Sequence, residues 1–212
     1  MGITIYARGR LDRIGDIPSL IDDLKGVAGD HNWSYHVIDD DFEAQPSTEP
    51  ARRDPGPPAA KIEGSLGLKG IVLNVGSGVE PLSILFDRSG VLTDMLQQRS
   101  WLQADGGNER FSLCKTQFGS IDSHIQVIGI LDLVKRKYLS DLAVTDEGAF
   151  WESRDRRILA EKRVALGQYL RAAEKVIGNI ERFEDDAQDP DAVARRIEEA
   201  LLKADEDGRL DR

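Results

Sequence analysis

The spacing of apolar residues predicts a β-α-β opening. Residues 3–9 are β-branched and aromatic, which is typical of a strand. Apolar residues recur three and four apart from 17 to 29, which predicts a helix with Asp16 or Ser19 as its N-cap. Residues 32–40 alternate apolar and polar positions, as a half-buried strand does. The chain is therefore expected to begin with a strand, a helix and a second strand.

Residues 44–60 interrupt this pattern. They hold five of the eight prolines and almost no large apolar residue, so we expect a surface loop rather than a linker between domains. Two apolar runs follow, one on each side of Gly76-Ser77-Gly78, and Asp87–Gly90 predict a turn of the kind that joins hairpin strands. Residues 91–110 fit either a third hairpin strand or a short helix and loop.

A strand, a long helix and a short strand complete the first predicted domain. Residues 111–118 predict the strand, helical spacing continues over 120–138, and 141–148 predict the last short strand. We therefore predict an α+β domain over residues 1–148. It contains a mixed, largely antiparallel sheet of five or six strands, with this helix and the one near 17–29 on one face.

From residue 149 the pattern becomes that of a long helix. Four apolar residues follow at intervals of seven, and three more fall between them at a/d spacing: Leu159, Leu166, Ala173 and Ile180, then Tyr169, Val176 and Phe183. This spacing predicts an a/d seam of the kind that pairs helices. A second helix is predicted after Pro190, so 149–212 should form a helical hairpin. We expect the hairpin to pack on the sheet domain, to associate with a second copy, or to bind a protein partner.

The formal net charge of −10 disfavours anionic partners. Nucleic acid needs a basic stripe for phosphate contacts, and an anionic membrane surface attracts basic segments. The nearest candidate is Lys135-Arg136-Lys137, at the end of a predicted helix. There, three cations complement the negative end of the helix dipole, so we predict neither nucleic acid nor membrane as a partner.

Two further features bear on the environment of the protein. No apolar segment reaches the roughly 18 residues of a membrane span, and the first residues predict a strand rather than a signal peptide. We therefore expect a cytoplasmic protein. Cys114 is the only cysteine, so an internal disulfide is excluded, and its apolar neighbours predict a buried thiol in a strand.

Residues 72–86 (VLNVGSGVEPLSILF) resemble the cofactor loop of class I S-adenosylmethionine-dependent methyltransferases. In that family, glycines let the backbone approach the ligand, and the N-terminus of the following helix faces its polar part. The resemblance implies S-adenosylmethionine as cofactor, but Asn74 replaces the usual acidic residue and Glu80 the last glycine. The alternative is a β-hairpin in which Gly76 and Gly78 supply positive φ.

His124 is the strongest candidate for chemistry. It falls inside the apolar arc of the predicted helix, where a histidine is typically a neutral core residue bonded to a backbone carbonyl. The functional alternative pairs His124 with Glu147 or Glu152, from the acidic segment DEGAFWESRD, for acid–base catalysis. No spacing matches a metal signature, so we predict no metal site.

A second hypothesis places an anion beside the same helix. Its N-terminus, near Ser120, offers free backbone N–H groups and the positive end of the helix dipole. Lys115 and Gln117 are alternate residues of a predicted strand and could face this point. The three residues are therefore candidate ligand-binding positions.

Three classes of function remain open. The acidic composition, the a/d-patterned helix and the absence of hydrolase, P-loop and kinase motifs favour a non-catalytic interaction protein. The alternatives are a small hydrolase or anion-binding enzyme that uses His124, and a methyltransferase. Apart from the methyltransferase resemblance, nothing in the sequence indicates a particular cofactor.

Overall fold

The computed structural model describes residues 3–43, 47–51, 59–63, 65–103 and 109–178. Its internal contacts divide the chain into two units, and the boundary falls between Arg156 and Arg157. The boundary predicted after Gly148 stays a prediction. Of the C-terminal helical hairpin predicted for 149–212, the second helix lies outside the described residues.

The first sheet has three antiparallel strands. In order across the sheet they are β8 (Ser112–Lys115), β1 (Thr4–Arg8) and β9 (Ala143–Asp146). Ile5, in the central strand, lies opposite Cys114 on one side and Asp146 on the other. Ile5 and Cys114 are buried, so this register places the Asp146 side chain on the same inward face.

The second sheet has four antiparallel strands. In order they are β2 (Tyr35–Asp39), β5 (Lys69–Leu73), β6 (Leu82–Phe86) and β7 (Leu92–Thr93). β6 lies beside β8 of the first sheet, because the Ser112 hydroxyl donates to the Ser83 carbonyl at 2.5 Å. Just before β6, the Glu80 N–H donates to the Lys115 carbonyl at 2.9 Å. The two sheets therefore meet along β6 and β8.

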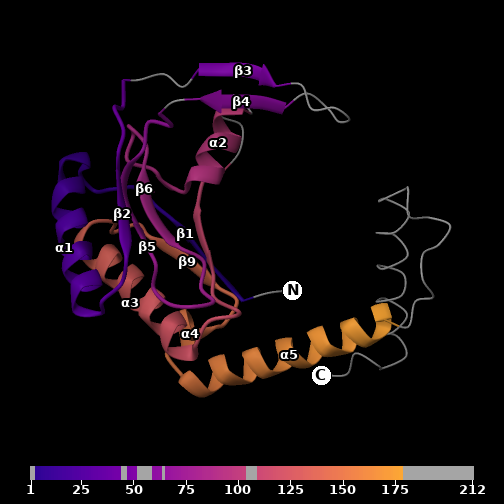
Figure 1. Cartoon of the computed structure of the whole chain (residues 1–212). Helices are drawn as coiled ribbons and strands as arrows, with labels where there is room; N and C mark the ends of the chain where they lie inside the picture. The colour runs from indigo at the N-terminus through magenta and orange to yellow at the C-terminus, as the bar shows by residue number, and fades with distance from the viewer. Residues whose placement is uncertain (1–2, 44–46, 52–58, 64, 104–108, 179–212) are drawn as a thin grey trace. The chain divides into compact units, whose positions relative to one another are not determined.

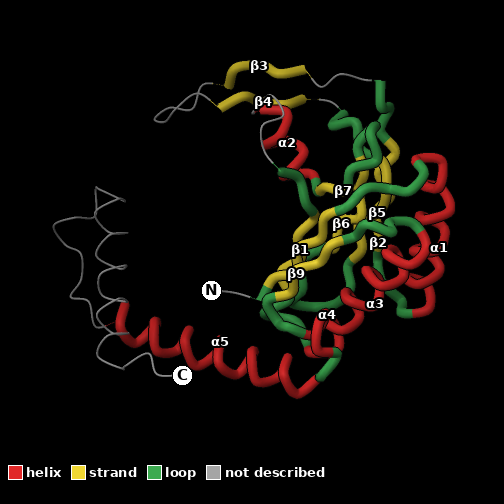
Figure 2. The backbone as a smooth tube through the Cα atoms, turned by 180° about the vertical axis from the view of Figure 1, so that it is seen from behind, coloured by secondary structure: helices red, strands yellow, loops and turns green. Residues whose placement is uncertain are grey.

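Two long helices lie side by side on the same side of these sheets (Figures 1 and 2). They are α1 (Ile17–Asp30) and α3 (Ile121–Lys137). Asp23 of α1 accepts hydrogen bonds from the Tyr138 hydroxyl at 2.6 Å and from Lys137 Nζ at 2.7 Å. These bonds join the middle of α1 to the C-terminal end of α3. The helices at 17–29 and 120–138 are thus confirmed to within two residues.

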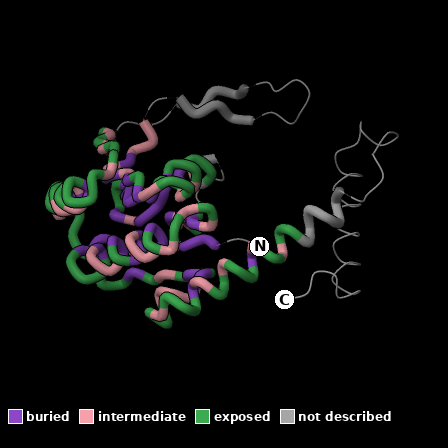
Figure 3. Tube along the Cα trace, turned by 60° about the horizontal axis from the view of Figure 1, so that its bottom comes forward, coloured by how far each residue is buried: buried purple, intermediate pink, exposed green. Residues whose placement is uncertain are grey.

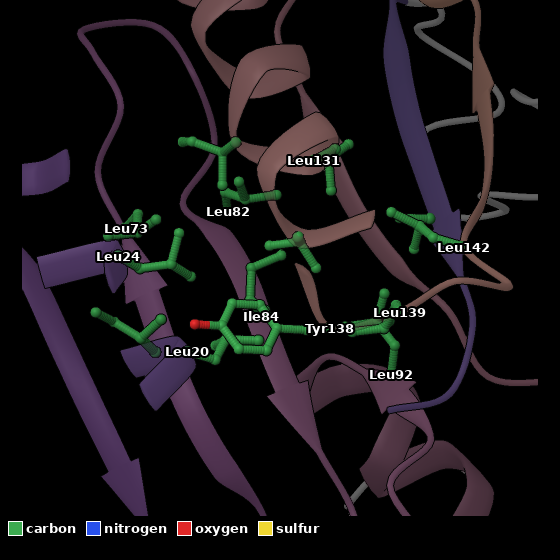
Figure 4. Close-up of a cluster of buried hydrophobic side chains, with 14 of the residues drawn as sticks. Leu20, Leu24, Leu73, Leu82, Ile84, Leu92, Leu131, Tyr138, Leu139 and Leu142 are labelled. Carbon is green, nitrogen blue, oxygen red and sulfur yellow. The ribbon is translucent and has the colours of Figure 1, made fainter. Parts of the chain in front are cut away.

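A single hydrophobic core joins both helices to both sheets. Figure 4 shows the centre of this core, where leucines of α1 and α3 meet side chains of β5, β6 and β7. Buried residues accordingly concentrate in the strands and in the helix faces that cover them (Figure 3). Cys114 is fully buried within this core, as predicted, and its thiol donates to the Glu80 carbonyl at 3.2 Å.

The remaining elements are short, apart from one helix. They are η1 (Ile14–Asp16), β3 (Ser47–Ala51), β4 (Ala59–Glu63), α2 (Met95–Gln103), α4 (Phe150–Ser153) and α5 (Arg156–Gly178). Asp16 is the N-cap residue of α1, but its side chain makes no capping hydrogen bond. α4 is flanked by Ala149 and Arg154, which both adopt the left-handed conformation. These two residues turn the chain sharply out of β9 and toward α5.

The α+β class is confirmed, and the sheet prediction needs two corrections. Within the described residues, the strands other than β3 and β4 form two antiparallel sheets rather than one sheet of five or six strands. The segment 44–60 is not only a loop, because β3 lies within it and pairs as an antiparallel hairpin with β4, which begins at Ala59. Alternating apolar residues are scarce there, so local spacing did not reveal this pairing. Residues 91–110 contain both predicted alternatives, first β7 and then α2.

Candidate functional site

His124 lies in the first turn of α3 and faces the core. The helix starts at this point because Ser120 is its N-cap, and the Ser120 hydroxyl accepts the Ser123 N–H at 2.9 Å. The next residue, His124, is then directed toward the sheets and has no exposed surface. The expectation of a core histidine is therefore confirmed.

Both ring nitrogens of His124 have a side-chain partner. Nδ1 lies 2.7 Å from Thr116 Oγ1, and Nε2 lies 3.1 Å from Asp146 Oδ2. An ionised Asp146 can only accept, so Nε2 donates to it, and the Thr116 hydroxyl also donates to the Ile3 carbonyl at 3.3 Å. The partners are side chains, not the backbone carbonyl that we expected. We call Thr116, His124 and Asp146 the His124 cluster.

Asp146 is an ionised carboxylate saturated with donors. Its oxygens accept the N–H groups of Gly148 at 2.7 Å, Phe150 at 2.8 Å and Trp151 at 3.0 Å. Burial would raise the pKa of Asp146, but the hydrogen bond and charge of His124, together with backbone N–H groups, hold it below its usual value. Asp146 thus joins β9 to α3 and also orients the first turn of α4.

The His124 cluster has the hydroxyl–imidazole–carboxylate order of a catalytic triad, but it is closed to substrate. Thr116 and His124 have no exposed surface, and neither does the Asp146 side chain. A nucleophile or general base must reach the reacting atoms to within hydrogen-bond distance. Within the described residues, no buried side-chain nitrogen or oxygen lacks a hydrogen-bond partner. The geometry is that of a structural cluster that holds four segments together.

The carboxylate beside His124 is Asp146, not Glu147 or Glu152. Glu147 is exposed, and its Oε2 accepts the Thr4 N–H at 2.7 Å, which fixes the end of β9 against β1. Glu152 is exposed on α4. The reason is strand alternation, because Asp146 shares the inward face of β9 with the half-buried Val144.

Lys115, Gln117 and Ser120 do not converge on one point. β8 ends at Lys115, so the strand alternation that we used to place Gln117 beside it does not continue. The Lys115 N–H donates to Glu80 Oε2 at 3.2 Å, whereas Gln117 Oε1 accepts the Ile3 N–H at 3.4 Å. Ser120 is occupied as the N-cap of α3.

Two of the three basic residues at the end of α3 form bonds within the fold. Lys135 Nζ donates to the Leu142 carbonyl, and Lys137 pairs with Asp23. All three residues of the Lys135–Lys137 run lie in the last turn of the helix, where positive charge is favourable.

The glycines of residues 72–86 join two strands. β5 and β6 pair as an antiparallel hairpin, and the segment after the glycines is a strand. A helix N-terminus of the kind that methyltransferases direct at their cofactor is therefore not formed there. Gly78 has positive φ (75°), as expected, but Gly76 does not. Gly76 instead leaves room for Ser123, because a Cβ there would lie 2.6 Å from Ser123 Oγ.

Comparison with known proteins gives no match: the chain matches no protein-family model, no curated protein and no solved structure. Within the described ranges, no three His, Cys, Asp or Glu side chains gather closely enough to hold a metal ion. In the same part of the chain, no helix has the length and apolar composition needed to cross a membrane.

Thr116 and Asp146 are the partners of His124 that the sequence analysis missed. A signal for Asp146 was present, because Leu142, Val144 and Asp146 are alternate residues of the predicted last strand, 141–148. Thr116 gave no comparable signal, since it lies one residue beyond β8 and its position depends on how the chain turns toward α3.

Proposed function

We propose that the protein is a non-catalytic interaction protein that associates with a second copy of itself through one face of α5. The exclusion of His124 from solvent supports the first part of this proposal, since the strongest catalytic candidate cannot contact a substrate. The distribution of apolar side chains on α5 supports the second part.

An apolar stripe on α5 carries the proposal. Leu159 and Leu166 lie seven residues apart, and Leu170 follows after four, the step between successive seam positions of a coiled coil. At 3.6 residues per turn these three side chains lie within about 40° of one another. Leu159 and Leu166 are buried, but Leu170 is 43% exposed. The stripe thus reaches the surface at Leu170, where a leucine of a second chain can cover it.

The test is the mass of the protein in solution, measured by light scattering over a wide range of concentration. We expect the wild-type chain to have the mass of two chains. The Leu170→Glu variant should have the mass of one chain, because a charge in an apolar seam opposes pairing. A one-chain mass for the wild type at every concentration would overturn the proposal.

The matched control is Val164→Glu. Val164 is more exposed than Leu170, at 58%, but it lies about 120° away around the helix. This variant should keep the two-chain mass. If Leu170→Glu also keeps it, the stripe is not the contact and the proposal fails.

A further inference from the structure

A small pocket lies between α1 and α3, the two helices that run side by side in Figures 1 and 2. Its volume is about 150 Å³, well below the roughly 300–1,000 Å³ of small-molecule sites. Val27 of α1 and Leu133 of α3 supply apolar walls, and Gln126 supplies an amide. The size fits the end of one side chain rather than a whole metabolite.

An aromatic pair forms another wall. His31 and Trp33 both line the pocket, and their rings are stacked at a centroid distance of 4.4 Å and an angle of 13°. Asn32 between them has positive φ (55°), a left-handed conformation that asparagine adopts more readily than most non-glycine residues. The Trp33 N–H donates to the Ala28 carbonyl at 2.8 Å, which fixes the turn to the end of α1. The ring pair is therefore held in place before any ligand arrives.

The charge around the pocket favours a cation. Among the described residues that line it, none is lysine or arginine. Asp30, adjacent to His31, is exposed, and it forms no ion pair within the described part of the chain. The C-terminal end of α1 adds partial negative charge at the same place. Two lysines of these helices are already paired: Lys25 of α1 with Asp22, and Lys137 of α3 with Asp23.

Elsewhere the chain binds a guanidinium with an aromatic face and a carboxylate. Arg154 Cζ lies 4.7 Å from the ring centroid of Trp151, and Arg154 also pairs with both oxygens of Asp132. An aromatic face and a carboxylate are the two groups that a planar guanidinium contacts best. The pocket offers His31 and Trp33 as the aromatic part and Gln126 as a further acceptor, and the exposed Asp30 directly precedes His31 in the chain.

From these features, we propose that the pocket between α1 and α3 receives an arginine side chain from a basic segment of a partner protein. This inference goes beyond self-association through α5 and does not depend on it. The net charge of −10 would attract such a segment from a distance.

The probe is a short synthetic peptide of alternating arginine and glycine, added to the full ¹⁵N-labelled chain. We expect amide shifts to cluster in residues 27–33 and 126–133, together with the Trp33 indole N–H. The same peptide with citrulline in place of arginine keeps the shape but loses the charge, so it should bind at least tenfold more weakly. The proposal would be overturned if the citrulline peptide, or a peptide with lysine in place of arginine, bound with the same affinity as the arginine peptide. Amide shifts scattered over the acidic surface would also overturn it.

Gly129 allows the pocket to be filled without unfolding the protein. It is an exposed residue in the middle of α3 that lines the pocket, and a Cβ there would meet nothing within 4 Å. Leucine has a higher helix propensity than glycine, so Gly129→Leu should fold at least as well as the wild type. We expect it to weaken arginine-peptide binding at least tenfold.

The matched control is Gly26→Leu in α1. Gly26 is also an exposed helix glycine with nothing within 4 Å of its Cβ position, but it does not line the pocket. Gly26→Leu should bind the peptide as the wild type does, and Asp30→Asn should bind it severalfold more weakly. Wild-type affinity in Gly129→Leu would show that the peptide does not occupy the pocket. The α5 proposal would be unaffected by that result, since its readout is mass.

Discussion

At the scale of single residues, the His124 cluster shows how this core accommodates polar groups. The imidazole and the carboxylate have no exposed side-chain surface. Burying such groups costs folding free energy unless each polar atom has a hydrogen-bond partner. Here Thr116 and Asp146 satisfy both ring nitrogens, and backbone N–H groups of α4 satisfy the carboxylate. The cluster therefore links segments that are distant in the sequence. Removing one member leaves the polar groups of the others buried without a hydrogen-bond partner.

We predict that Asp146→Ala lowers the free energy of unfolding by about 3 kcal/mol, because it leaves His124 Nε2 and three backbone N–H groups without their acceptor. Urea unfolding measures this change. Glu152→Ala, which removes an exposed carboxylate nearby, should cost under about 1 kcal/mol. Equal losses in the two variants would contradict the structural role of Asp146.

The same residue predicts a dependence on pH. The pKa of Asp146 is lowered in the folded state: burial opposes this, but His124 and backbone N–H groups outweigh it. Its contribution is therefore present above the unfolded pKa of about 3.9 and is lost as the pH falls through the folded pKa. The difference in unfolding free energy between wild type and Asp146→Asn should shrink below about pH 4. A difference that stays constant down to pH 3 would contradict this assignment.

At the scale of elements, two loops are in close contact beside the start of α3. The loop between β5 and β6 passes so close to the loop after β8 that a Cβ on Gly78 would lie 2.3 Å from the Phe118 carbonyl oxygen. Conversely, a Cβ on Gly119 would lie 2.3 Å from the Val79 side chain. Glycine is required on both sides of this contact, which explains the spacing that resembled a cofactor loop.

We predict that Gly78→Ala destabilises the fold by at least about 2 kcal/mol, since it combines positive φ with a backbone clash. Gly67 separates the two effects, because it has a similar φ (65°) but nothing within 4 Å of a Cβ. Gly67→Ala should therefore cost only about 1 kcal/mol. Thermal unfolding of both variants gives the comparison, and equal losses would mean that the loops do not press on each other.

At the scale of the whole molecule, the hydrophobic core is built from one of the two units. Every buried member of the core cluster lies between Ile5 and Leu142. The ion pair between Arg156 and Asp122 and the packing of Trp151 against the core also fall within residues up to Arg156. Residues up to Arg156 therefore contain a hydrophobic core of their own, which is what a domain needs in order to fold alone.

We predict that a chain ending at Arg156 folds without α5. It should unfold in one cooperative thermal transition and give a dispersed amide spectrum. In solution it should also have the mass of a single chain, because the proposed contact surface is removed. A broad transition, with strong binding of a hydrophobic dye, would show that α5 is needed for the fold.

The local spacing of apolar residues was sufficient to predict the helices and most strands, but not which strands pair with one another. Both long helices and most strands follow from apolar periodicity and from caps such as Ser120. The pairing of β1 with both β8 and β9 joins residues more than a hundred positions apart, and no local pattern encodes it. The same limit applies to the site: spacing placed His124 in the core and marked Asp146 as an alternate residue of the last strand, but the pairing of Asp146 with Ile5 came only from the structure.

The burial of Cys114 has a practical consequence for labelling. Its thiol has no exposed surface, and burial raises its pKa to about 12, so almost no thiolate is present near neutral pH. A cysteine introduced on the surface would then be the fast-reacting thiol of the chain, and a single fluorophore or spin label could be attached without removing Cys114. Reaction of Cys114 itself with a thiol reagent would require β8 to leave the sheet, so its rate would report how often that strand opens.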